Sequence, residues 1–458
     1  MRLLAVIACT TLGPPAMPAR AQGVAPPVVP RAPGLAAPTA TRAVGPLILQ
    51  ASPPSKPADA GDRERHVAAP LTLPEVVDRF LRRNLAVEAA RSRVDVAQAE
   101  RIASRLRPNP TVTVLGNQFA LSGPTPFSEL YELSATYAQP IEWPEKRRLR
   151  REVGDLTVSV AEAQLADVLR QRLADVKRAF YEAVLAANLL ELARENRRSY
   201  DDLVALNQTR FEEGAIAEGE LLKVKLERVK FDTAVAQAQL AARQATIKLL
   251  ALLDAEDVDS ATPVTGDLAF TAAPLDLNAL RAQALQTSTI VQVAERGVGL
   301  AERRIGLEQA RVTPEPTPFL GYQRVGPDNA ILFGVSVPLP LFDRNQGGIA
   351  RARAEAGLSR TDLTQARIRV LAEVESAFRG WESARDRVVV FERGLLAQAD
   401  ESRAIALAAY QEGAVTLLAV LEAERARTEI RQQYLQALFD FQASLVLLEA
   451  LTGVDVQP

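Results

Sequence analysis

The chain has 458 residues, which is enough for two or three ordinary domains. Hydrophobic residues make up 48% of it and aromatic residues only 5%, a composition typical of long helices packed side by side rather than of an aromatic-rich globular core. The formal net charge of −2 provides no argument for nucleic acid as a partner.

Residues 1–21 have the features of a secretory signal peptide. Arg2 supplies a positive charge, residues 3–12 are mostly apolar, and the sequence ARA at 19–21 is an A-x-A cleavage site. A lipoprotein signal is the alternative, because the sequence VIAC ending at Cys9 loosely matches a lipidation motif. Simple cleavage would remove Cys9, and a chain without cysteine needs no disulfide bonds in an oxidising compartment such as the periplasm.

Residues 22–70 are rich in Pro and Ala and show little periodicity, which predicts a disordered or extended linker. This segment contains His66, the only histidine of the chain. A single histidine in a linker is a poor candidate for a metal or catalytic site, so we assign it no function.

The rest of the chain contains one unit twice, in residues 71–260 and 275–455, with a linker over residues 261–274. Each unit opens with a predicted amphipathic helix of about 35 residues. In the first unit Thr72 is the expected N-cap and Glu75 would complete a capping box. In the second unit Asp276 is the expected N-cap.

A pair of strands follows each of Pro108 and Pro314, the prolines that end the opening helices. The strands are expected at about residues 110–120, 130–142, 316–325 and 330–341. Apolar and polar residues alternate with a period of two along the second strand of each pair, and strands of about ten residues with one apolar face are typical of membrane β-barrels. No run of 18 uncharged apolar residues follows the signal peptide, so we predict no transmembrane helix.

Each strand pair leads into a very long helix, expected at about residues 146–211 and 346–410. The long helices end in the matching sequences FEEGA at 211–215 and YQEGA at 410–414, and a return helix follows each. A helix of about 65 residues is roughly 100 Å long, and the opening and return helices each have roughly half that length. We therefore predict that each unit forms two parallel rods, one of them made of two short helices end to end.

Four membrane strands cannot close a barrel alone, because the smallest membrane barrels have about eight strands and an open sheet edge is not tolerated in lipid. Copies of the chain must share one barrel. Two copies would give eight strands and a filled interior, whereas three would give twelve strands and leave room for water. The object predicted is a tube that crosses a membrane and extends far from it.

The sequence QPIEWPEKR at 139–147 and the sequence VPLPLFDRNQG at 337–347 resemble the TolC-like outer-membrane factor family, and within it the cation-efflux (CzcC-like) branch. A glycine usual in the first sequence is Glu145 here. The resemblance implies a homotrimer with a shared 12-stranded transmembrane β-barrel, continued by a long periplasmic α-helical barrel. It further implies an outer-membrane channel of a tripartite efflux system, with a periplasmic adaptor protein and an inner-membrane pump of the RND type as partners.

Two sets of residues match the family's functional positions. The tips of the two hairpins, where adaptor helices bind in the family, correspond to Glu213, Gly214, Ala215, Glu412, Gly413 and Ala414. The family's periplasmic gate corresponds to Glu220 and Glu422, with Ala419 in place of a carboxylate and Val415 in place of an arginine. The glycines also suit a helix C-cap with positive φ, and Glu422 also suits a solvated helix surface.

The run of basic residues at 146–151 directly follows the second strand, where the barrel would meet the periplasm. Its long side chains are expected to extend along the helices or toward lipid headgroups. Trp143 and Tyr137 suit the aromatic girdle of a membrane barrel, or else ordinary packing.

Nothing in the sequence indicates an enzyme, a cofactor or a bound metal. One histidine in a linker leaves no Ser-His or Cys-His pair, and no phosphate-binding loop occurs. Heavy-metal cations are the expected cargo, and drug efflux or type I protein secretion is the alternative. A periplasmic adaptor or a purely structural coiled-coil protein would explain the helices, but neither explains two strand pairs with membrane alternation.

Overall fold

The structure is a computed structural model that describes residues 70–119, 122–124, 126–255, 259–271 and 274–453. The predicted signal peptide, Cys9, His66 and nearly all of the predicted linker at 22–70 lie outside the described residues. The first unit contains α1 (Leu73–Arg83), α2 (Leu85–Arg105), β1 (Thr111–Asn117), α3 (Phe127–Leu130), β2 (Glu132–Ala138), α4 (Pro144–Glu212) and α5 (Glu218–Leu252). The second contains α6 (Leu277–Thr287), α7 (Thr289–Ala310), β3 (Thr317–Val325), β4 (Asp328–Ser336), α8 (Gln346–Val390), the π-helical turn η1 (Phe391–Leu395), α9 (Leu396–Gln411) and α10 (Leu417–Thr452).

Each opening helix is two helices rather than the single one predicted. The breaks are at Asn84 and Ser288, both in extended conformation. The side chain of Asn84 accepts a hydrogen bond from the N–H of Val87 and donates to the carbonyl of Leu252 and to the carboxylate of Asp254. The break therefore lets Asn84 cap α2 and tie its start to the end of α5.

Of the two predicted N-cap residues, only one makes a capping hydrogen bond with its side chain. Asp276 caps α6 as expected, accepting from the N–H of Asn278 at 2.9 Å. Thr72 is the N-cap residue of α1, as predicted, and its carbonyl accepts from the N–H of Val76, but its side chain makes no capping hydrogen bond and the predicted capping box is absent. Pro74 occupies one of the positions whose N–H a cap would bind, and Glu75 pairs with Arg79 at 2.5 Å instead of turning back.

The long rod of the second unit is interrupted, although a continuous helix was predicted at 346–410. Helix α4 runs for 69 residues without a break, about 100 Å. Its counterpart is split into α8 and α9 by η1, where Gly394 has φ 142°, a value that side-chain-bearing residues rarely adopt.

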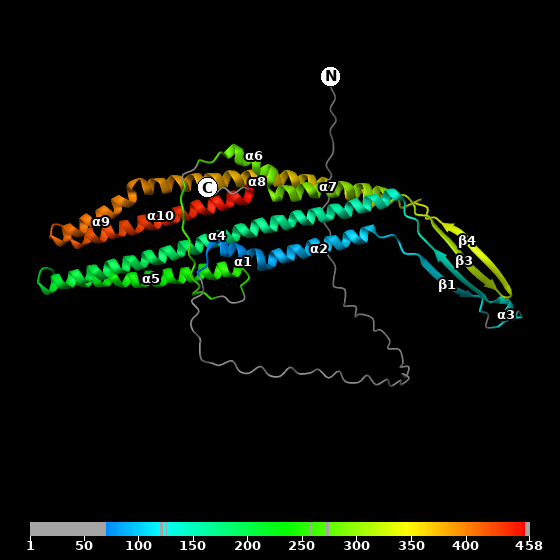
Figure 1. Ribbon diagram of the computed structural model, residues 1–458, viewed down its shortest axis with the longest axis horizontal. Coiled ribbons are helices and arrows are strands. Elements are labelled where there is room, and N and C mark those ends of the chain that lie inside the picture. Colours follow the sequence, from blue (N-terminus) through cyan, green and yellow to red (C-terminus); the bar gives the residue numbers. More distant parts are fainter. Residues whose placement is uncertain (1–69, 120–121, 125, 256–258, 272–273, 454–458) are drawn as a thin grey trace, which may run out of the picture. The chain divides into compact units, whose positions relative to one another are not determined.

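The helices lie side by side in one layer (Figure 1). Helix α4 contacts α2 over one half of its length and α5 over the other, which confirms that two short helices together match the long one. Toward the strands the order of contacts is α2, α4, α7, α8, and toward the helix turns it is α5, α4, α10, α9. Contacts of α4 with α7 and α10 join the two units.

The four predicted strands form one antiparallel sheet in the order β1-β2-β3-β4. The central pair, β2 with β3, joins the two units. A two-residue turn at Gly326 and Pro327 connects β3 to β4, and Gly326 takes a positive φ of 52° there. Within the chain, β1 and β4 each have a partner on one side only.

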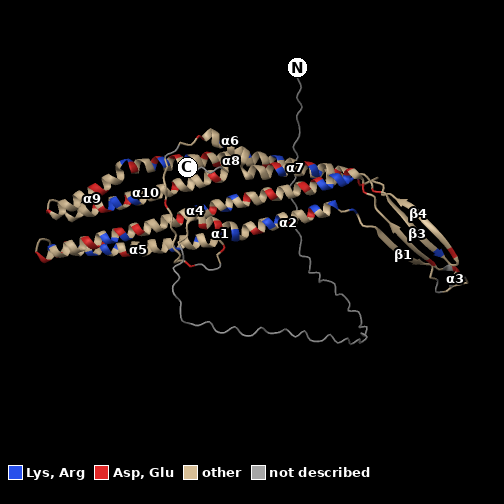
Figure 2. Cartoon of the chain, viewed as in Figure 1, with Lys and Arg blue, Asp and Glu red and all other residues tan. Residues whose placement is uncertain are grey.

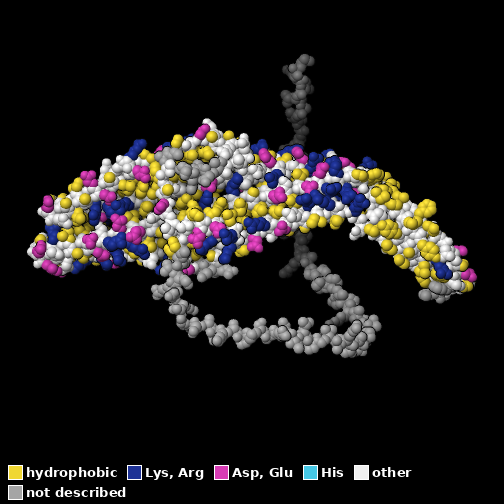
Figure 3. Space-filling model, viewed as in Figure 1, with side chains coloured by type: hydrophobic (Ala, Val, Ile, Leu, Met, Phe, Trp, Pro, Cys, Tyr) yellow, Lys and Arg dark blue, Asp and Glu magenta, His cyan; other side chains and the backbone are white. Residues whose placement is uncertain are grey.

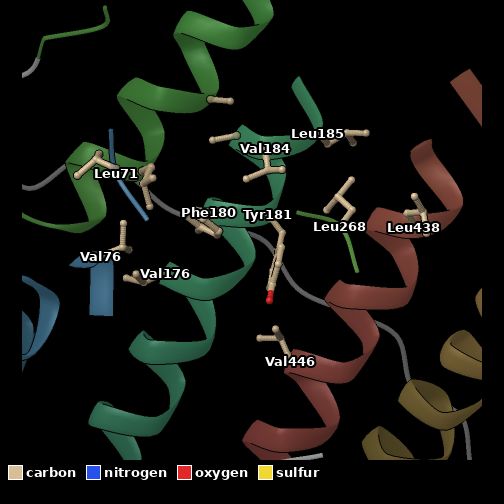
Figure 4. Close-up of a cluster of buried hydrophobic side chains, with 14 of the residues drawn as sticks. Leu71, Val76, Val176, Phe180, Tyr181, Val184, Leu185, Leu268, Leu438 and Val446 are labelled. Atoms are coloured by element: carbon tan, nitrogen blue, oxygen red, sulfur yellow. The ribbon is translucent and has the colours of Figure 1, made fainter. Parts of the chain in front are cut away.

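The largest buried cluster lies where α1, α4, α5 and α10 meet (Figure 4). Phe180 and Val184 of α4 belong to it, together with Leu438 and Val446 of α10 and Leu71 at the start of the described chain. Burial of each such side chain contributes about 1.5–3 kcal/mol, so apolar packing holds the two units together at mid-length.

Helix α10 is long and apolar enough to cross a membrane by length and composition alone. It nevertheless contacts α4, α8 and α9, and 56% of its most apolar window is buried inside the protein. We therefore describe α10 as a packing helix of the helical layer.

Candidate functional site

One face of the sheet is apolar and exposed. Val112, Tyr137, Leu320 and Phe333 lie side by side across the four strands. They are between 49% and 82% exposed, although each is a large apolar or aromatic residue. Figure 3 shows the same apolar character over the strands on the face in view. An apolar surface of this extent on a sheet requires contact with lipid or protein.

The opposite face of the sheet is smaller and more polar. Its neighbouring row consists of Thr113, Thr136, Gly321 and Leu332. A row near the turn between β3 and β4 contains Asn117, Glu132, Val325 and Asp328. This division is the one found in membrane barrels, where apolar residues face lipid and polar residues face a water-filled interior.

The two hairpin tips lie at the same end of the helices (Figure 1). Gly214 and Gly413 have φ values of 75° and 76°, and no atom would lie within 4 Å of an added Cβ. In each turn the following alanine N–H donates to a carbonyl five residues earlier, at 2.8 Å. The glycines are thus required by backbone conformation, not by space. All six predicted tip residues are exposed: Glu213, Gly214, Ala215, Glu412, Gly413 and Ala414.

A direct contact joins the two tips. Arg210 of α4 donates to the carbonyl oxygen of Tyr410 at 2.7 Å, and its guanidinium lies 4.6 Å from the centre of the Tyr410 ring. The hydroxyl of Tyr410 donates to the side-chain oxygen of Asn207. Burial raises the pKa of Tyr410, which keeps the hydroxyl protonated and able to donate. Tyr410 thus connects α9 to two residues of α4.

The predicted gate residues lie close to this contact. Glu220 is in the first turn of α5, and its negative charge helps to raise the pKa of Tyr410, after the larger effect of burial. Glu422 is exposed on α10. Within the described residues neither glutamate forms an ion pair. Val415 and Ala419, which lie where the tip turn leads into α10, have uncharged side chains and cannot form one either.

Further from the tips, four charged residues join the two hairpins. Arg427 of α10 donates to Glu195 of α4 at 2.7 Å and to Asp400 of α9 at 2.6 Å. Arg431, one turn further along α10, pairs with Glu195 and with Asp400, each at 3.0 Å. We call Glu195, Asp400, Arg427 and Arg431 the inter-hairpin clamp.

The clamp is partly shielded from water. The side chain of Arg427 is 9% exposed, whereas Glu195 and Asp400 are 42% and 45% exposed. Hydrogen bonding from Arg427 lowers the pKa of Glu195, and the charges of both arginines lower it further. For Asp400, burial would raise the pKa, but hydrogen bonds from Arg427 and Arg431 outweigh it and lower the pKa. Both carboxylates are therefore ionised at neutral pH.

A second polar group lies between the clamp and the tips. Glu424 of α10 is 6% exposed, accepts from Arg403 of α9 at 2.6 Å and accepts from the Ser199 hydroxyl of α4 at 2.9 Å. Tyr200, on the next position of α4, is buried, and burial with the nearby charge of Glu424 raises its pKa to about 12. Three helices are thus joined again by charged and polar groups.

The family model described as "Outer membrane efflux protein" matches residues 76–255 and 280–454. The chain belongs to the outer membrane efflux protein family. Members of this family are outer-membrane channels, so the protein is a passive conduit of the outer membrane and not an enzyme. The apolar face of its sheet is accordingly the face turned to lipid.

Two curated relatives and two solved structures define the similarity further. The chain is 24% identical over 399 residues to the cobalt-zinc-cadmium resistance protein CzcC of Cupriavidus metallidurans, covering 85% of this chain and 91% of that protein. It is 27% identical over 341 residues to the protein CyaE of Bordetella pertussis, covering 69% and 70%.

The structure of CusC superposes with a TM-score of 0.71 at 20% identity, covering 84% of this chain and 93% of that one. VceC of Vibrio cholerae superposes with a TM-score of 0.70 at 19% identity, covering 84% and 96%. The predicted TolC-like fold, with a duplicated helix–hairpin–helix unit, is thereby confirmed.

The basic run at 146–151 is largely neutralised by neighbours in this efflux protein. Lys146 pairs with Glu315, Arg148 pairs with Glu145 and Glu152, and Arg150 pairs with Glu142. Arg150 also donates to the carbonyl oxygens of Ser104 and Leu106, at the C-terminus of α2. Since Lys146, Arg148 and Arg150 form ion pairs within the protein, only the remaining basic residues of the run are free to contact lipid headgroups.

The clamp and the Tyr410 contact were not among the predicted site residues. Arg427 and Glu195 lie 232 residues apart, so no local pattern connects them. A signal for Tyr410 was present, because the matching position of the first tip sequence is Phe211, which has no hydroxyl. In the described part of the chain no group of three or more His, Cys, Asp or Glu residues is placed to hold a metal ion.

Proposed function

We propose that the protein is the outer-membrane channel of a tripartite efflux system and passively releases heavy-metal cations driven out by an inner-membrane pump of the RND type. The similarity to a cobalt-zinc-cadmium resistance protein over 91% of that protein's length supports this cargo. The observation that carries the channel itself is the single helical layer continued by a sheet with one lipid-facing surface.

A complete channel requires several copies, and we propose three. One chain leaves β1 and β4 with an unpaired edge each, and its outermost helices expose large apolar side chains. These side chains include Ile102 of α2 and Leu226 of α5 on one margin, and Ile368 of α8 and Ile405 of α9 on the other. Pairing one margin with the opposite margin of the next copy closes a ring with antiparallel strands throughout. Three copies give twelve strands, which leave a water-filled interior.

The residues that the structure describes contain no Cys, Met or His, so they offer little selectivity among metal ions. Selective binding of soft metal ions requires Cys, Met or clustered His ligands. A ring of three carboxylates, one from Glu422 of each copy, would attract cations of any kind by its local field. Cargo choice therefore rests with the pump.

Glu220 and Glu422 form the proposed gate, and Glu422 can be tested in single-channel recordings. We expect Glu422→Gln to lower the preference for cations, because it removes a ring of charges at the mouth. Glu401→Gln, an exposed carboxylate on α9, is the matched control. Unchanged selectivity in the Glu422 variant contradicts the ring.

The exposed tips are the proposed binding site of a periplasmic adaptor. Cysteines at Ala215 and Ala414 should form crosslinks to the adaptor, since both alanines are exposed beside the tip glycines. Ala236, an exposed alanine further along α5, provides the control position. Absence of adaptor crosslinks from both tip positions contradicts docking at the tips.

The cargo is tested by deleting the gene and measuring growth. We expect sensitivity to zinc, cobalt or cadmium to increase, while sensitivity to drugs and secretion of proteins stay unchanged. Restoration of resistance by the intact gene is the control. Increased sensitivity to drugs alone, or loss of a secreted protein alone, contradicts the metal cargo but leaves the channel in place.

A further inference from the structure

Positive charge gathers where the strands meet the helices. Residues 101–107, 142–155, 302–315 and 342–355 contain fourteen Lys and Arg but only nine Asp and Glu, whereas the whole chain has a net charge of −2. Figure 2 shows basic residues, coloured blue, near the ends of α2, α4 and α7 that adjoin the strands. On the face seen in Figure 3 the basic patch directly follows the apolar surface of the strands.

Five exposed arginines of these segments form no ion pair with a carboxylate of the described residues, and Arg304 and Arg353 are two of them. The other three are Arg107, Arg151 and Arg344. Arg147 is only weakly engaged, with a 3.4 Å contact from its guanidinium to the carbonyl oxygen of Arg105. Exposed guanidinium groups without a carboxylate are free to bind another anion.

The spacing of these residues fits one side of a membrane interface. Trp143, Arg147 and Arg151 are four residues apart along the start of α4, so they lie on one stripe of the helix. Arg147 lies about 6 Å and Arg151 about 12 Å further from the strands than Trp143. The contact between Arg147 and the backbone of Arg105 brings the end of α2, which continues to Arg107, to the same level.

These levels match the headgroup layer of a bilayer. Tryptophan prefers the boundary between hydrocarbon and headgroups, and the Trp143 ring is 46% exposed. The headgroup layer extends about 5–8 Å beyond the hydrocarbon on each side. An arginine side chain can extend several ångström back toward this layer while its stem lies along the helix. Both arginines of the stripe thus reach phosphate groups.

We propose that Arg107, Arg151 and Arg344, together with Trp143, form a collar that binds the phosphate groups of anionic phospholipids in the periplasmic leaflet of the outer membrane. The proposal rests on the lipid-facing placement of the strands, and it does not depend on the cargo. Guanidinium groups bind phosphate oxygens through bidentate, charge-assisted hydrogen bonds. We expect them to bind a lipid with a net negative charge more tightly than a neutral or zwitterionic lipid. The collar would fix the depth of the channel in the membrane.

The test compares lipids bound to the purified, detergent-solubilised channel by native mass spectrometry. Phosphatidylglycerol and phosphatidylcholine with identical acyl chains are the probes. We expect the wild-type channel to prefer phosphatidylglycerol, and the triple variant R107Q/R151Q/R344Q to lose that preference. The loss should be on the order of fivefold in affinity for each arginine that contacts a phosphate.

Two further variants separate the collar from a general charge effect. R178Q/R243Q/R393Q removes three exposed arginines from the helices far from the strands and should keep the preference. R107K/R151K/R344K keeps the positive charge and should retain most of it. All variants should show the same oligomer on native gels, since the substituted side chains are exposed.

The collar is refuted if the wild-type channel binds both lipids equally, or if the triple glutamine variant keeps the preference. Sodium phosphate at the same phosphate concentration should leave phosphatidylglycerol bound. Displacement by sodium phosphate would show a site for free phosphate and overturn the lipid assignment. Metal resistance is measured separately, so failure of the collar and failure of the proposed cargo give different results.

Discussion

The inter-hairpin clamp makes a sharp prediction, because its two carboxylates differ only in what they join. Glu195 connects the arginines of α10 to α4, which belongs to the other hairpin, whereas Asp400 connects the same arginines to α9 of their own hairpin. We expect that opening of the channel mouth requires the two hairpins to separate at this end. Glu195→Gln should therefore favour the open channel, and Asp400→Asn should not.

The magnitude follows from the exposure of the partners. Exposed ion pairs contribute about 0–1 kcal/mol, and breaking a fully buried pair costs about 3–5 kcal/mol. Arg427 is nearly buried, but Glu195 is 42% exposed and Arg431 remains beside Asp400. We therefore expect about 1–2 kcal/mol for Glu195→Gln in each copy. This corresponds to roughly a tenfold shift of the closed-to-open ratio.

The assay is single-channel recording in planar bilayers at neutral pH, with thermal unfolding of each variant as the stability measure. Both variants should lower thermal stability by similar amounts, because the two carboxylates have similar exposure and the same partners. Only Glu195→Gln should raise the open probability. Equal open probabilities in the two variants would show that the clamp stabilises the fold without holding the hairpins closed, and the reasoning would be refuted.

Three more predictions concern the clamp and the sheet. Hydrogen bonding from Arg427 lowers the pKa of Glu195 below 4.5, so the clamp stabilises the closed channel fully above about pH 4.5 and loses this effect as the pH falls through the lowered pKa. Conductance should therefore be constant from pH 7 to 5 and rise in stronger acid. The Glu195→Gln variant should lack this rise. Gly321→Ala should reduce the heat-modifiable oligomer on gels, because the added Cβ would lie 2.8 Å from a backbone oxygen of β2, at a cost of about 1–3 kcal/mol. Gly299→Ala, in open space on α7, should leave the oligomer unchanged. Phe333→Arg on the lipid face should destabilise the channel by about 2–4 kcal/mol in urea unfolding from lipid. The matched variant is Leu332→Arg, on the opposite face. If the two variants were equally stable, the assignment of the faces would be contradicted.

The strands and their faces were predictable because the signals are local. Alternation of apolar and polar residues has a period of two in the second strand of each pair, and each pair follows a proline that ends a helix. The structure ends two strands earlier than predicted: β2 runs from Glu132 to Ala138, and β4 ends at Ser336, although it begins at Asp328, two residues before the predicted start. Pro140 and Pro338 follow these ends and have no N–H for a continued ladder.

The helix breaks were not predictable, because their causes lie far away in the chain. An asparagine is tolerated in a helix at modest cost, so Asn84 gives no local sign of a break. What stabilises the break is a pair of acceptors, Leu252 and Asp254, more than 160 residues away. The predicted tip residues, in contrast, stand in a short repeated sequence, although their role as a docking site stays a prediction.

The interruption at η1 and the clamp belong together. Gly394 has a non-helical φ of 142° within η1, so the helix is kinked here rather than continued as a regular helix. Asp400 and Arg403 follow η1 within ten residues of Gly394, and both contact α10. Both side chains belong to the part of the rod that follows the kink, so the kink sets the direction from which they approach α10. Helix α4 has no such kink and carries Glu195 on an uninterrupted helix. For this reason we expect the second hairpin, whose attachment depends on ion pairs, to be the one that moves when the channel opens.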